Sequence, residues 1–390
     1  MVRKKVDYLI IGNGISGLSA ANEIRKNDEK GNITIVSKEH YLTYYRVKLT
    51  EYICKDFKEE DLLVNKKDWY KEKNINVILG KIVEEVDFNN NLIKLDDGVL
   101  IEYKKLLLST GSRPFVPPIA GKFKKGVFAL RSIKDLKDIQ EYLLNCKNIT
   151  IIGGGLLGLE AAWAVKQLNK EVNIVEFAPY LLPKQLDEEL SKRLSKKLEK
   201  LGFNIYLNSA AEEILGKSKV SGLKVSGGRT FETDSILISS GIRPNLDLVR
   251  DTELEFNKGI IVDKYLRTNM SNVYAAGDVV EVDSTVLGLW TVGNEQGKIA
   301  GLNMAGETKE YTLSEPYTRL EIGDIKLFSM GDINEFDKIY EYKKGEEIHH
   351  KLFTTNGKIT GGILFGDIKD MFKLREAILV GNHIENFELS

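Results

Sequence analysis

One pattern occurs twice in this chain and limits its fold more than any other feature. Residues 6–17 and 147–158 each contain a short apolar run, then G-x-G-x-x-G at the start of a helical pattern. A second pair of matching segments follows at a similar distance, since residues 106–114 (LLLSTGSRP) and 236–244 (ILISSGIRP) are identical at five of nine positions. A single glycine motif arises easily by chance. Two motifs with the same following signature indicate a duplicated structural unit.

Each unit has the order of elements expected for a parallel sheet. A helical pattern follows each glycine motif, at residues 17–28 and 158–169, and a short β-like run comes next, at residues 33–36 and 172–175. Strands that alternate with helices favour a doubly wound sheet with helices on both faces. The sequence therefore predicts an α/β fold with two Rossmann-like dinucleotide-binding domains.

The three glycines of each motif have separate structural roles. We expect Gly12 to permit the tight turn after the strand, Gly14 to let a pyrophosphate approach the backbone, and Gly17 to allow close packing of helix and sheet. The N-terminus of the following helix offers free N–H groups and a partial positive charge to an anion. The corresponding residues of the second motif are Gly153, Gly155 and Gly158. Both motifs are therefore candidate dinucleotide-binding loops.

An acidic residue after the second strand distinguishes the two units. Glu176 follows that strand in the second unit, 23 positions beyond Gly153. A carboxylate at this place accepts hydrogen bonds from the ribose hydroxyl groups and repels a 2′-phosphate, and no arginine adjoins it. The second unit is therefore expected to bind NADH rather than NADPH. In the first unit the corresponding residue is Ser37, followed by Lys38 and Glu39, which is a weaker ribose signature.

Composition excludes several kinds of function. The chain has 56 basic and 57 acidic side chains, so its net charge of −1 gives no reason to expect nucleic acid or an anionic membrane as a partner. Its two cysteines, Cys54 and Cys146, are too few for a disulfide framework, a four-thiolate zinc site or an iron–sulfur cluster held by this chain alone. No metal site is expected, and redox chemistry would require an organic cofactor. The apolar run at residues 8–11 is too short for a signal peptide or a membrane span, so we expect a buried strand there and a cytoplasmic protein.

The last part of the chain has a different character. Residues 317–366 contain short β-like runs separated by frequent turn signals, and a polar helical segment follows. This pattern predicts a small α+β domain over residues 309–390. That segment contains no motif with a recognisable chemical role.

Four motifs in a fixed order identify the family that the chain resembles. They are the glycine motif of residues 12–17, Ser-Thr-Gly at 109–111, Gly-Gly-Gly-Leu-Leu-Gly-Leu-Glu at 153–160 and Tyr-Ala-Ala-Gly-Asp at 274–278. The chain resembles the FAD-dependent pyridine nucleotide reductases with the glutathione-reductase-like fold, over about residues 6–305.

The resemblance implies a domain arrangement. Residues 1–113 and 236–308 would form a split FAD-binding domain, and the NADH-binding domain, residues 114–235, would be inserted between its two parts. The small C-terminal domain, residues 309–390, would follow.

The resemblance also implies roles for individual residues. Asp278 matches the aspartate that binds the ribityl chain of FAD, and Thr110 and Gly111 match a segment near the FAD pyrophosphate. Glu160 matches a glutamate that faces the nicotinamide pocket, and Trp290 matches a position beside the isoalloxazine ring, so both are candidate catalytic residues. Simpler alternatives are a turn aspartate for Asp278 and a core aromatic residue for Trp290. Further residues assigned to cofactors are Ser37, Lys38 and Arg46 for FAD and Gly241 for NADH.

The subfamily depends on cysteines that are missing from the expected place. Disulfide reductases of this fold carry a Cys-x4-Cys pair after the first ribose position, and flavin peroxidases carry one cysteine there, whereas residues 40–51 contain none. Cys54 lies beyond that position in an apolar context, so thiol-based mechanisms are disfavoured. Residues 44–49 and 182–187 are instead similar to reductases of small carrier proteins, with NADH:rubredoxin reductases as the closest group. Glu51 replaces a lysine of many ferredoxin reductases, which weakens the ferredoxin interpretation.

The resemblance therefore implies an oxidoreductase that takes hydride from NADH onto FAD and passes electrons to a small carrier protein. Rubredoxin is the first expectation and flavodoxin or another carrier the alternative, and residues 46–48 and 122–125 offer basic side chains to an acidic partner. Two other functions stay open, namely an NADH oxidase that reduces oxygen at the flavin and a flavin-bound redox-sensing module. The electron-entry half of NADH nitrite reductases shares this architecture, but we expect that enzyme to need additional cysteine-rich modules.

Overall fold

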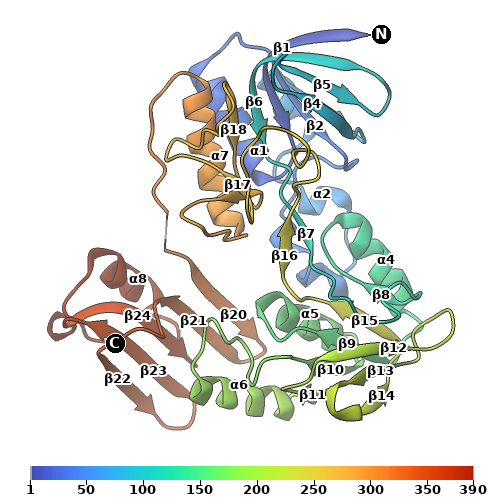
Figure 1. Cartoon of the computed structure of the whole chain (residues 1–390). Coiled ribbons are helices and arrows are strands. Elements are labelled where there is room, and N and C mark those ends of the chain that lie inside the picture. The colour runs from blue at the N-terminus through green and yellow to red at the C-terminus, as the bar shows by residue number, and fades with distance from the viewer. Residues whose placement is uncertain (1, 314, 390) are drawn as a thin grey trace. The chain divides into compact units, whose positions relative to one another are not determined.

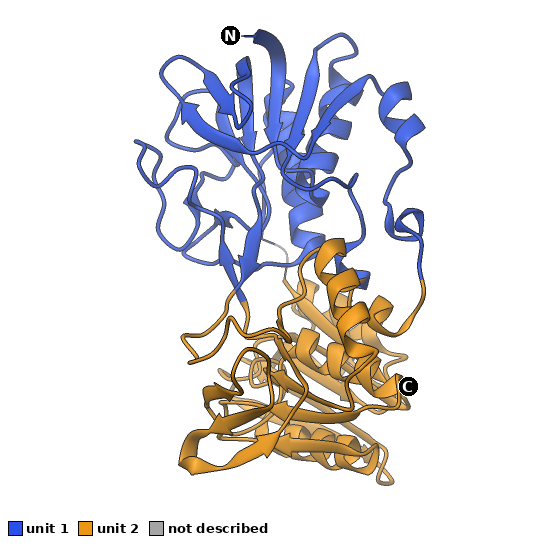
Figure 2. Ribbon diagram, turned by 90° about the vertical axis from the view of Figure 1, so that its right-hand side faces the viewer, with its two compact units in different colours: residues 1–48, 57–114, 242–314 blue, residues 49–56, 115–241, 315–390 orange. Residues whose placement is uncertain are grey.

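The chain divides into two units in the computed structural model, which describes residues 2–313 and 315–389 (Figure 2). One unit comprises residues 1–48, 57–114 and 242–314, and the other comprises residues 49–56, 115–241 and 315–390. Each unit has its own sheets and its own apolar core.

The main sheet of the first unit contains the first glycine motif at the end of its central strand (Figure 1). In spatial order its strands are β3 (Ile75–Leu79), β2 (Ile33–Ser37), β1 (Arg3–Ile11), β6 (Leu100–Leu108), β5 (Leu92–Leu95) and β4 (Val83–Asp87), and β18 (Val273–Ala275) also pairs with β6. β1, β2, β3, β6 and β18 run parallel, whereas β4 and β5 form an antiparallel hairpin beside the first half of β6.

The sequence of β1 and β2 explains their central place. Residues 8–11 of β1 and all of β2 are buried, as expected for apolar strands covered on both faces of a parallel sheet. The register aligns Ile11 with Val36 and Leu108, so β1, β2 and β6 end at the same edge of the sheet. Cofactors of doubly wound sheets bind at such a carboxyl edge.

Two long helices of the first unit pack at very short range. A Cβ atom at Gly297 of α7 (Trp290–Met304) would lie 2.3 Å from the carbonyl oxygen of Ser16 in α1 (Ile15–Asn27). Only glycine allows this approach, because any side chain would collide with α1. The absence of a side chain at Gly297 therefore lets α7 pack directly against the first turns of α1. The shorter elements of this unit are η1 (Arg46–Lys48), α2 (Glu59–Leu62), α3 (Lys67–Glu72), β7 (Ser112–Pro114), β16 (Ile242–Pro244), β17 (Ile260–Ile261) and β19 (Val280–Glu281).

The second unit contains the second glycine motif in a smaller parallel sheet. Its strands are β11 (Phe203–Tyr206), β10 (Glu171–Val175), β9 (Asn148–Ile152), β15 (Ser235–Ile238) and β8 (Val127–Phe128), in that order. Its helices are α4 (Ile133–Leu143), α5 (Leu156–Gln167) and α6 (Glu188–Lys200), with a 3₁₀ turn, η2 (Glu51–Cys54), against α4 and α5. β15 belongs to the second unit. The segment 236–308, which is expected to belong to an FAD-binding domain, therefore begins inside a strand of the second unit's sheet.

The C-terminal part of the second unit is a separate antiparallel sheet with one helix. The sheet has the order β20 (Tyr317–Ile322), β21 (Ile325–Gly331), β24 (Lys358–Phe365), β23 (Ile348–Thr355) and β22 (Lys338–Lys344), and α8 (Met371–Val380) packs against β21 and β24. The remaining elements of this unit are β12 (Ala211–Leu215), β13 (Gly222–Val225), β14 (Thr230–Glu232), η3 (Ser226–Gly228) and η4 (Ile384–Asn386). Two mainly parallel sheets and a small α+β part confirm the predicted fold class. Within the described residues, every helix is too short or too polar to cross a lipid bilayer.

Candidate cofactor-binding site

The first glycine of each motif has the same backbone geometry in the two units. Gly12 and Gly153 have φ values of +116° and +120°, a region that favours glycine. A Cβ atom would lie 2.1 Å from the carbonyl oxygen of Ser109 at the first position and 2.3 Å from that of Ser239 at the second. Both turns therefore require glycine, as the spacing predicts.

The second and third glycines differ from each other in their surroundings. An added Cβ would meet no atom within 4 Å at Gly14 or at Gly155, so the backbone is open to a ligand at both places. At Gly17 and Gly158 it would lie 2.1 Å and 2.0 Å from the carbonyl oxygen of the first glycine. Neither α1 nor α5 has a side-chain cap, which leaves the N–H groups of their first turns available to an anion. These loops fit a pyrophosphate.

Glu176 and Ser37 occupy corresponding positions in the two sheets. Glu176 directly follows β10, and its carboxylate accepts hydrogen bonds from the backbone N–H groups of Gly154 (2.5 Å) and Ala178 (2.7 Å). This acid therefore lies against the second glycine motif, where a ribose would sit. Ser37 ends β2, is buried, and accepts a hydrogen bond from the N–H group of Glu39 at 3.2 Å. Lys38 is exposed.

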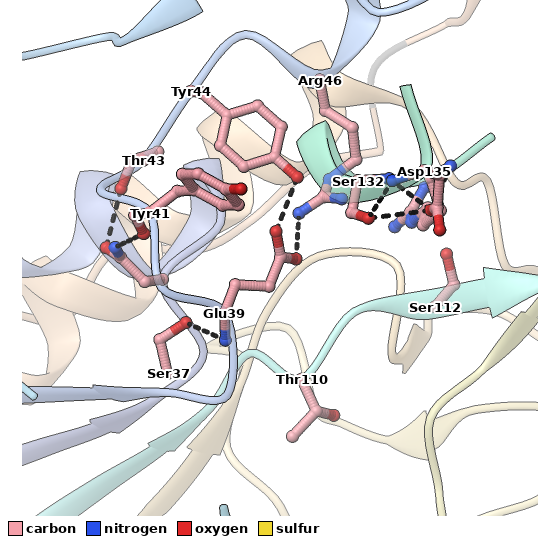
Figure 3. A network of polar contacts seen from close by, with 12 residues as sticks. Ser37, Glu39, Tyr41, Thr43, Tyr44, Arg46, Thr110, Ser112, Ser132 and Asp135 are labelled. Carbon is pink, nitrogen blue, oxygen red and sulfur yellow. Dashed lines mark hydrogen bonds and ion pairs between the residues drawn. The ribbon is translucent and has the colours of Figure 1, made fainter. Parts of the chain in front are cut away.

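An ion pair close to Ser37 was not predicted from the sequence (Figure 3). The Oε1 atom of Glu39 accepts a hydrogen bond from Arg46 at 2.8 Å, and its Oε2 atom accepts one from the Tyr44 hydroxyl group at 2.7 Å. Burial disfavours the charged carboxylate, but Arg46 and Tyr44 outweigh it and lower the pKa of Glu39 below its ordinary value. Glu39 is therefore ionised at neutral pH and orients Arg46. In the sequence, the only indication of a role for Glu39 was its position two residues after Ser37, the candidate ribose-binding residue.

The segment that carries Arg46 is attached to the first glycine motif. Asn13 lies between the first two glycines, and its side chain accepts a hydrogen bond from Thr43 at 2.7 Å and donates one to the carbonyl oxygen of Tyr41 at 3.3 Å. Asn13 thus links the glycine turn to residues 41–46. Sequence reasoning treated Asn13 as a variable position of the motif.

Asp278 belongs to a second group of polar contacts in the first unit. Its Oδ2 atom accepts a hydrogen bond from the Ser112 hydroxyl group at 2.8 Å. Thr110 donates to the carbonyl oxygen of Asn245 at 3.1 Å, and the carbonyl oxygen of Gly111 accepts from the N–H group of Asn245 at 2.9 Å. The structure therefore brings Thr110, Gly111 and Asp278 to one place, together with Ser112 and Asn245, which the sequence did not single out.

Trp290 lies in an aromatic stack with an unpaired polar atom. Its ring stacks on Tyr45 with the centroids 5.8 Å apart, and the ammonium group of Lys48 lies 4.9 Å from the centre of the Tyr45 ring. The Nε1 atom of Trp290 is buried and has no hydrogen-bond partner in the described residues. Buried N–H groups without a partner are costly, so this atom fits a site that a ligand completes.

In the second unit, Glu160 is half-buried on α5 and accepts a hydrogen bond from the Thr50 hydroxyl group at 3.2 Å. Burial raises the pKa of Glu160, the charge of Glu51 raises it further, and the hydrogen bond from Thr50 opposes both. Gly241 has a φ value of +96° and open space around it, so it also tolerates a nearby ligand. Glu160 and Trp290 belong to different units.

One group of side chains has the spacing of a metal site. Single ligand atoms of Glu189, Glu341 and His349 all lie within 4.8 Å of one another. The ammonium group of Lys351 is 2.6 Å from Glu189 and 3.4 Å from Glu341, so a cation already neutralises these carboxylates. The group is therefore explained as an ion-pair cluster.

Comparison with known proteins shows which family has this sequence pattern. Residues 6–297 match the pyridine nucleotide-disulphide oxidoreductase family, and residues 316–381 match the C-terminal domain of rubredoxin NAD+ reductase. The chain is 36% identical to a nitrite reductase [NAD(P)H] of Bacillus subtilis over 93% of its own length, but it spans only about half (46%) of that protein.

A relative of similar length is an NADH-rubredoxin oxidoreductase of Clostridium acetobutylicum, which is 34% identical and matches over 98% of this chain and 97% of its own. The crystal structure of NADH:rubredoxin oxidoreductase from the same organism superposes with a TM-score of 0.83 and 30% identity, over 99% of this chain and 98% of that chain. Both dinucleotide motifs lie within the matched region. The chain therefore belongs to the pyridine nucleotide-disulphide oxidoreductase family.

Proposed function

We propose that this protein takes hydride from NADH onto bound FAD and delivers the electrons to rubredoxin. One observation carries the proposal: both α1 and α5 present open N-termini to an anion, but only the second has a carboxylate, Glu176, at its ribose position. Because the two sites differ at this position, they suit two different dinucleotides, with FAD at the first loop and NADH at the second. The match of residues 316–381 to a domain of rubredoxin reductases supports the choice of acceptor.

The residues that would hold the two cofactors lie around the two glycine loops. FAD is assigned to Gly12, Gly14, Gly17, Ser37, Lys38, Arg46, Thr110, Gly111 and Asp278. NADH is assigned to Gly153, Gly155, Gly158, Glu176 and Gly241, and Glu160 and Trp290 are assigned to the nicotinamide and flavin pocket as candidate catalytic residues. The proposed domains are 1–113 with 236–308 for FAD, 114–235 for NADH, and 309–390 as a small C-terminal domain.

Bound FAD would supply a hydride acceptor that can release electrons one at a time. The protein supplies position and charge: the helix N-termini hold the pyrophosphates, Glu176 holds a ribose, and Arg46 brings a fixed positive charge. Cys146 does not suit a redox thiol, because it is buried and that burial raises its pKa, and Cys54 lies three positions beyond residues 40–51, where the thiol-dependent relatives carry their redox cysteine. This arrangement favours a flavin that works without a thiol.

Anaerobic stopped-flow spectroscopy tests the proposal. The purified protein should be yellow and should lose its flavin absorbance when mixed with NADH, and rubredoxin should restore that absorbance faster than flavodoxin or oxygen does. A protein without FAD, or a reduced protein that oxygen reoxidises faster than rubredoxin, would contradict it. The second outcome would identify an NADH oxidase.

The relation to nitrite reductases supports a second candidate. The chain matches about half of the Bacillus protein at 36% identity, so it could serve as the NADH-oxidising part of a nitrite-reducing system. In that case the reduced protein should be reoxidised by a nitrite-reducing module, and rubredoxin should have no effect on the rate.

A further inference from the structure

Thr50 makes a side-chain contact with Glu160 that crosses 110 positions of sequence. Its hydroxyl group donates to Oε2 of Glu160 at 3.2 Å, and no other hydrogen-bond partner of that carboxylate occurs in the described residues. Oε1 therefore keeps its capacity to accept. Thr50 is 9% exposed, so water competes little for its hydroxyl group.

The backbone around Thr50 is firmly held in the second unit. Its carbonyl oxygen accepts a hydrogen bond from the N–H group of Ile53 at 3.2 Å, which closes the first turn of η2. The side chain of Gln140 on α4 donates to the carbonyl oxygens of both Tyr52 and Lys55, at 2.8 Å each. η2 is thus fixed to α4 and packs against α5, so the hydroxyl group of Thr50 has a defined position.

One charged residue of η2, Glu51, acts on Glu160. Glu51 raises the pKa of Glu160, although its own carboxylate pairs with Lys55 at 2.5 Å. β20 also packs against α5, and its charged residues, Arg319 and Glu321, pair with each other. The hydrogen bond from Thr50 is the contact that favours the ionised form of Glu160.

We propose that Thr50 is a positioning residue for NADH: it holds one oxygen atom of Glu160 and leaves the other to accept a hydrogen bond from the nicotinamide carboxamide. This inference rests on the proposed function, because it requires NADH in the second unit. Glu51 has a related effect, since its negative charge adds to the effect of burial and raises the pKa of Glu160.

Substitutions of Thr50 and of Glu51, the two neighbours of Glu160, should shift the pH dependence of nucleotide binding in opposite directions. An ionised carboxylate is the stronger acceptor, so affinity should fall as acid protonates Glu160. Thr50→Val removes a contact that favours ionisation, so the fall should begin at higher pH. Glu51→Gln removes a negative neighbour, so the fall should begin at lower pH.

The experiment uses the full-length FAD-loaded protein. NAD+ binding is measured by its effect on the flavin absorbance, and the KM for NADH and kcat are measured in parallel, for wild type, T50V, T50S, E51Q and E160Q across pH. T50V should raise the KM about threefold to tenfold at neutral pH with little change in kcat, T50S should restore the wild-type value, and E160Q should remove the acid-dependent loss of affinity.

The results separate three outcomes. Opposite shifts in T50V and E51Q, with rescue by T50S, would support the inference. Equal pH profiles in wild type, T50V and E51Q, or no rescue by T50S, would overturn it while NADH still binds. If the wild-type protein binds no NAD+ and oxidises no NADH, the proposed function itself fails. If T50V does not fold, T50A removes the same hydroxyl group and decides the question by the same comparison with T50S.

Discussion

The ammonium group of Lys351 donates a hydrogen bond of 2.5 Å to Oδ2 of Asp187, the residue that caps the N-terminus of α6. Lys351 lies on β23, and its side chain is 4% exposed. The same ammonium group is 2.6 Å from Glu189 in the first turn of α6. One buried cation therefore attaches the C-terminal sheet to a helix of the second dinucleotide-binding region.

Replacement of Lys351 by methionine should weaken this attachment. We expect the free energy of unfolding to fall by about 2 kcal/mol, because the substitution removes the buried cation that pairs with Asp187, Glu189 and Glu341. Lys343 still pairs with Glu189 and Glu341, and Glu189 is half-exposed, so the loss stays below that of a fully buried pair. Urea denaturation followed by circular dichroism measures the change. The control is K192M, which breaks the exposed pair with Glu188 and should cost at most about 1 kcal/mol. Equal losses in the two variants would contradict the prediction.

Acid should loosen the same region through Glu341. The hydrogen bond from Lys343, with the nearby charge of Lys351, lowers the pKa of Glu341 to about 2 from 4.5. The folded state therefore binds fewer protons than the unfolded state, so this contribution is complete above pH 4.5 and is lost as the pH falls toward 2. Thermal unfolding across this range should show a falling Tm for wild type and a flatter profile for E341Q. Parallel profiles would exclude this role of Glu341.

Gly297→Ala should disturb the proposed FAD site through the packing of α7 against α1. The new methyl group would lie 2.3 Å from the carbonyl oxygen of Ser16, at the first turn of α1, so α7 must move away. Such overpacking costs about 1–3 kcal/mol, and we expect lower thermal stability and partial loss of FAD on purification. The matched control is K298A, an exposed site on the same helix. A G297A variant as stable and as yellow as K298A would show that the two helices adjust freely.

Glu39→Gln should weaken FAD binding. The substitution removes the carboxylate that orients Arg46, and a charge-assisted contact is roughly twice as strong as a neutral one. We expect the Kd of the apoprotein for FAD to rise about tenfold, an effect of about 1.4 kcal/mol. Tyr44→Phe keeps the ion pair and removes only one hydroxyl group, so it should have a smaller effect. If Y44F weakens binding as much as E39Q, the ion pair with Arg46 is not the important contact.

Glu176→Arg should change the choice of nucleotide. The carboxylate is held by the N–H groups of Gly154 and Ala178, so the residue at this position faces the glycine motif. A positive charge there would attract a 2′-phosphate instead of repelling it. The ratio of kcat/KM for NADH over NADPH should fall at least about tenfold, which steady-state kinetics can measure. An unchanged ratio would remove Glu176 from the ribose site.

Much of the framework could be predicted from local sequence. The three glycines of each motif are recognisable because a positive φ value, an open backbone and a close helix contact all require the absence of a side chain. The alternation of apolar strands and helices indicated the parallel sheets for a similar reason, since periodicity follows from local backbone geometry. The positions of Gly12, Gly153 and Glu176 relative to their strands agree with these predictions.

The contacts around the predicted residues depended on tertiary structure. Ser112 meets Asp278 across 166 positions, Thr50 meets Glu160 across 110, and Lys351 meets Asp187 across 164. No periodicity or motif encodes such pairs, because their partners are brought together only when separate elements pack. The sequence by itself thus determined that two glycine loops of the dinucleotide-binding type exist and which of them is followed by an acid after its second strand. Only the folded chain decided which hydroxyl groups, carboxylates and ammonium groups set the orientation and charge of the residues around those loops.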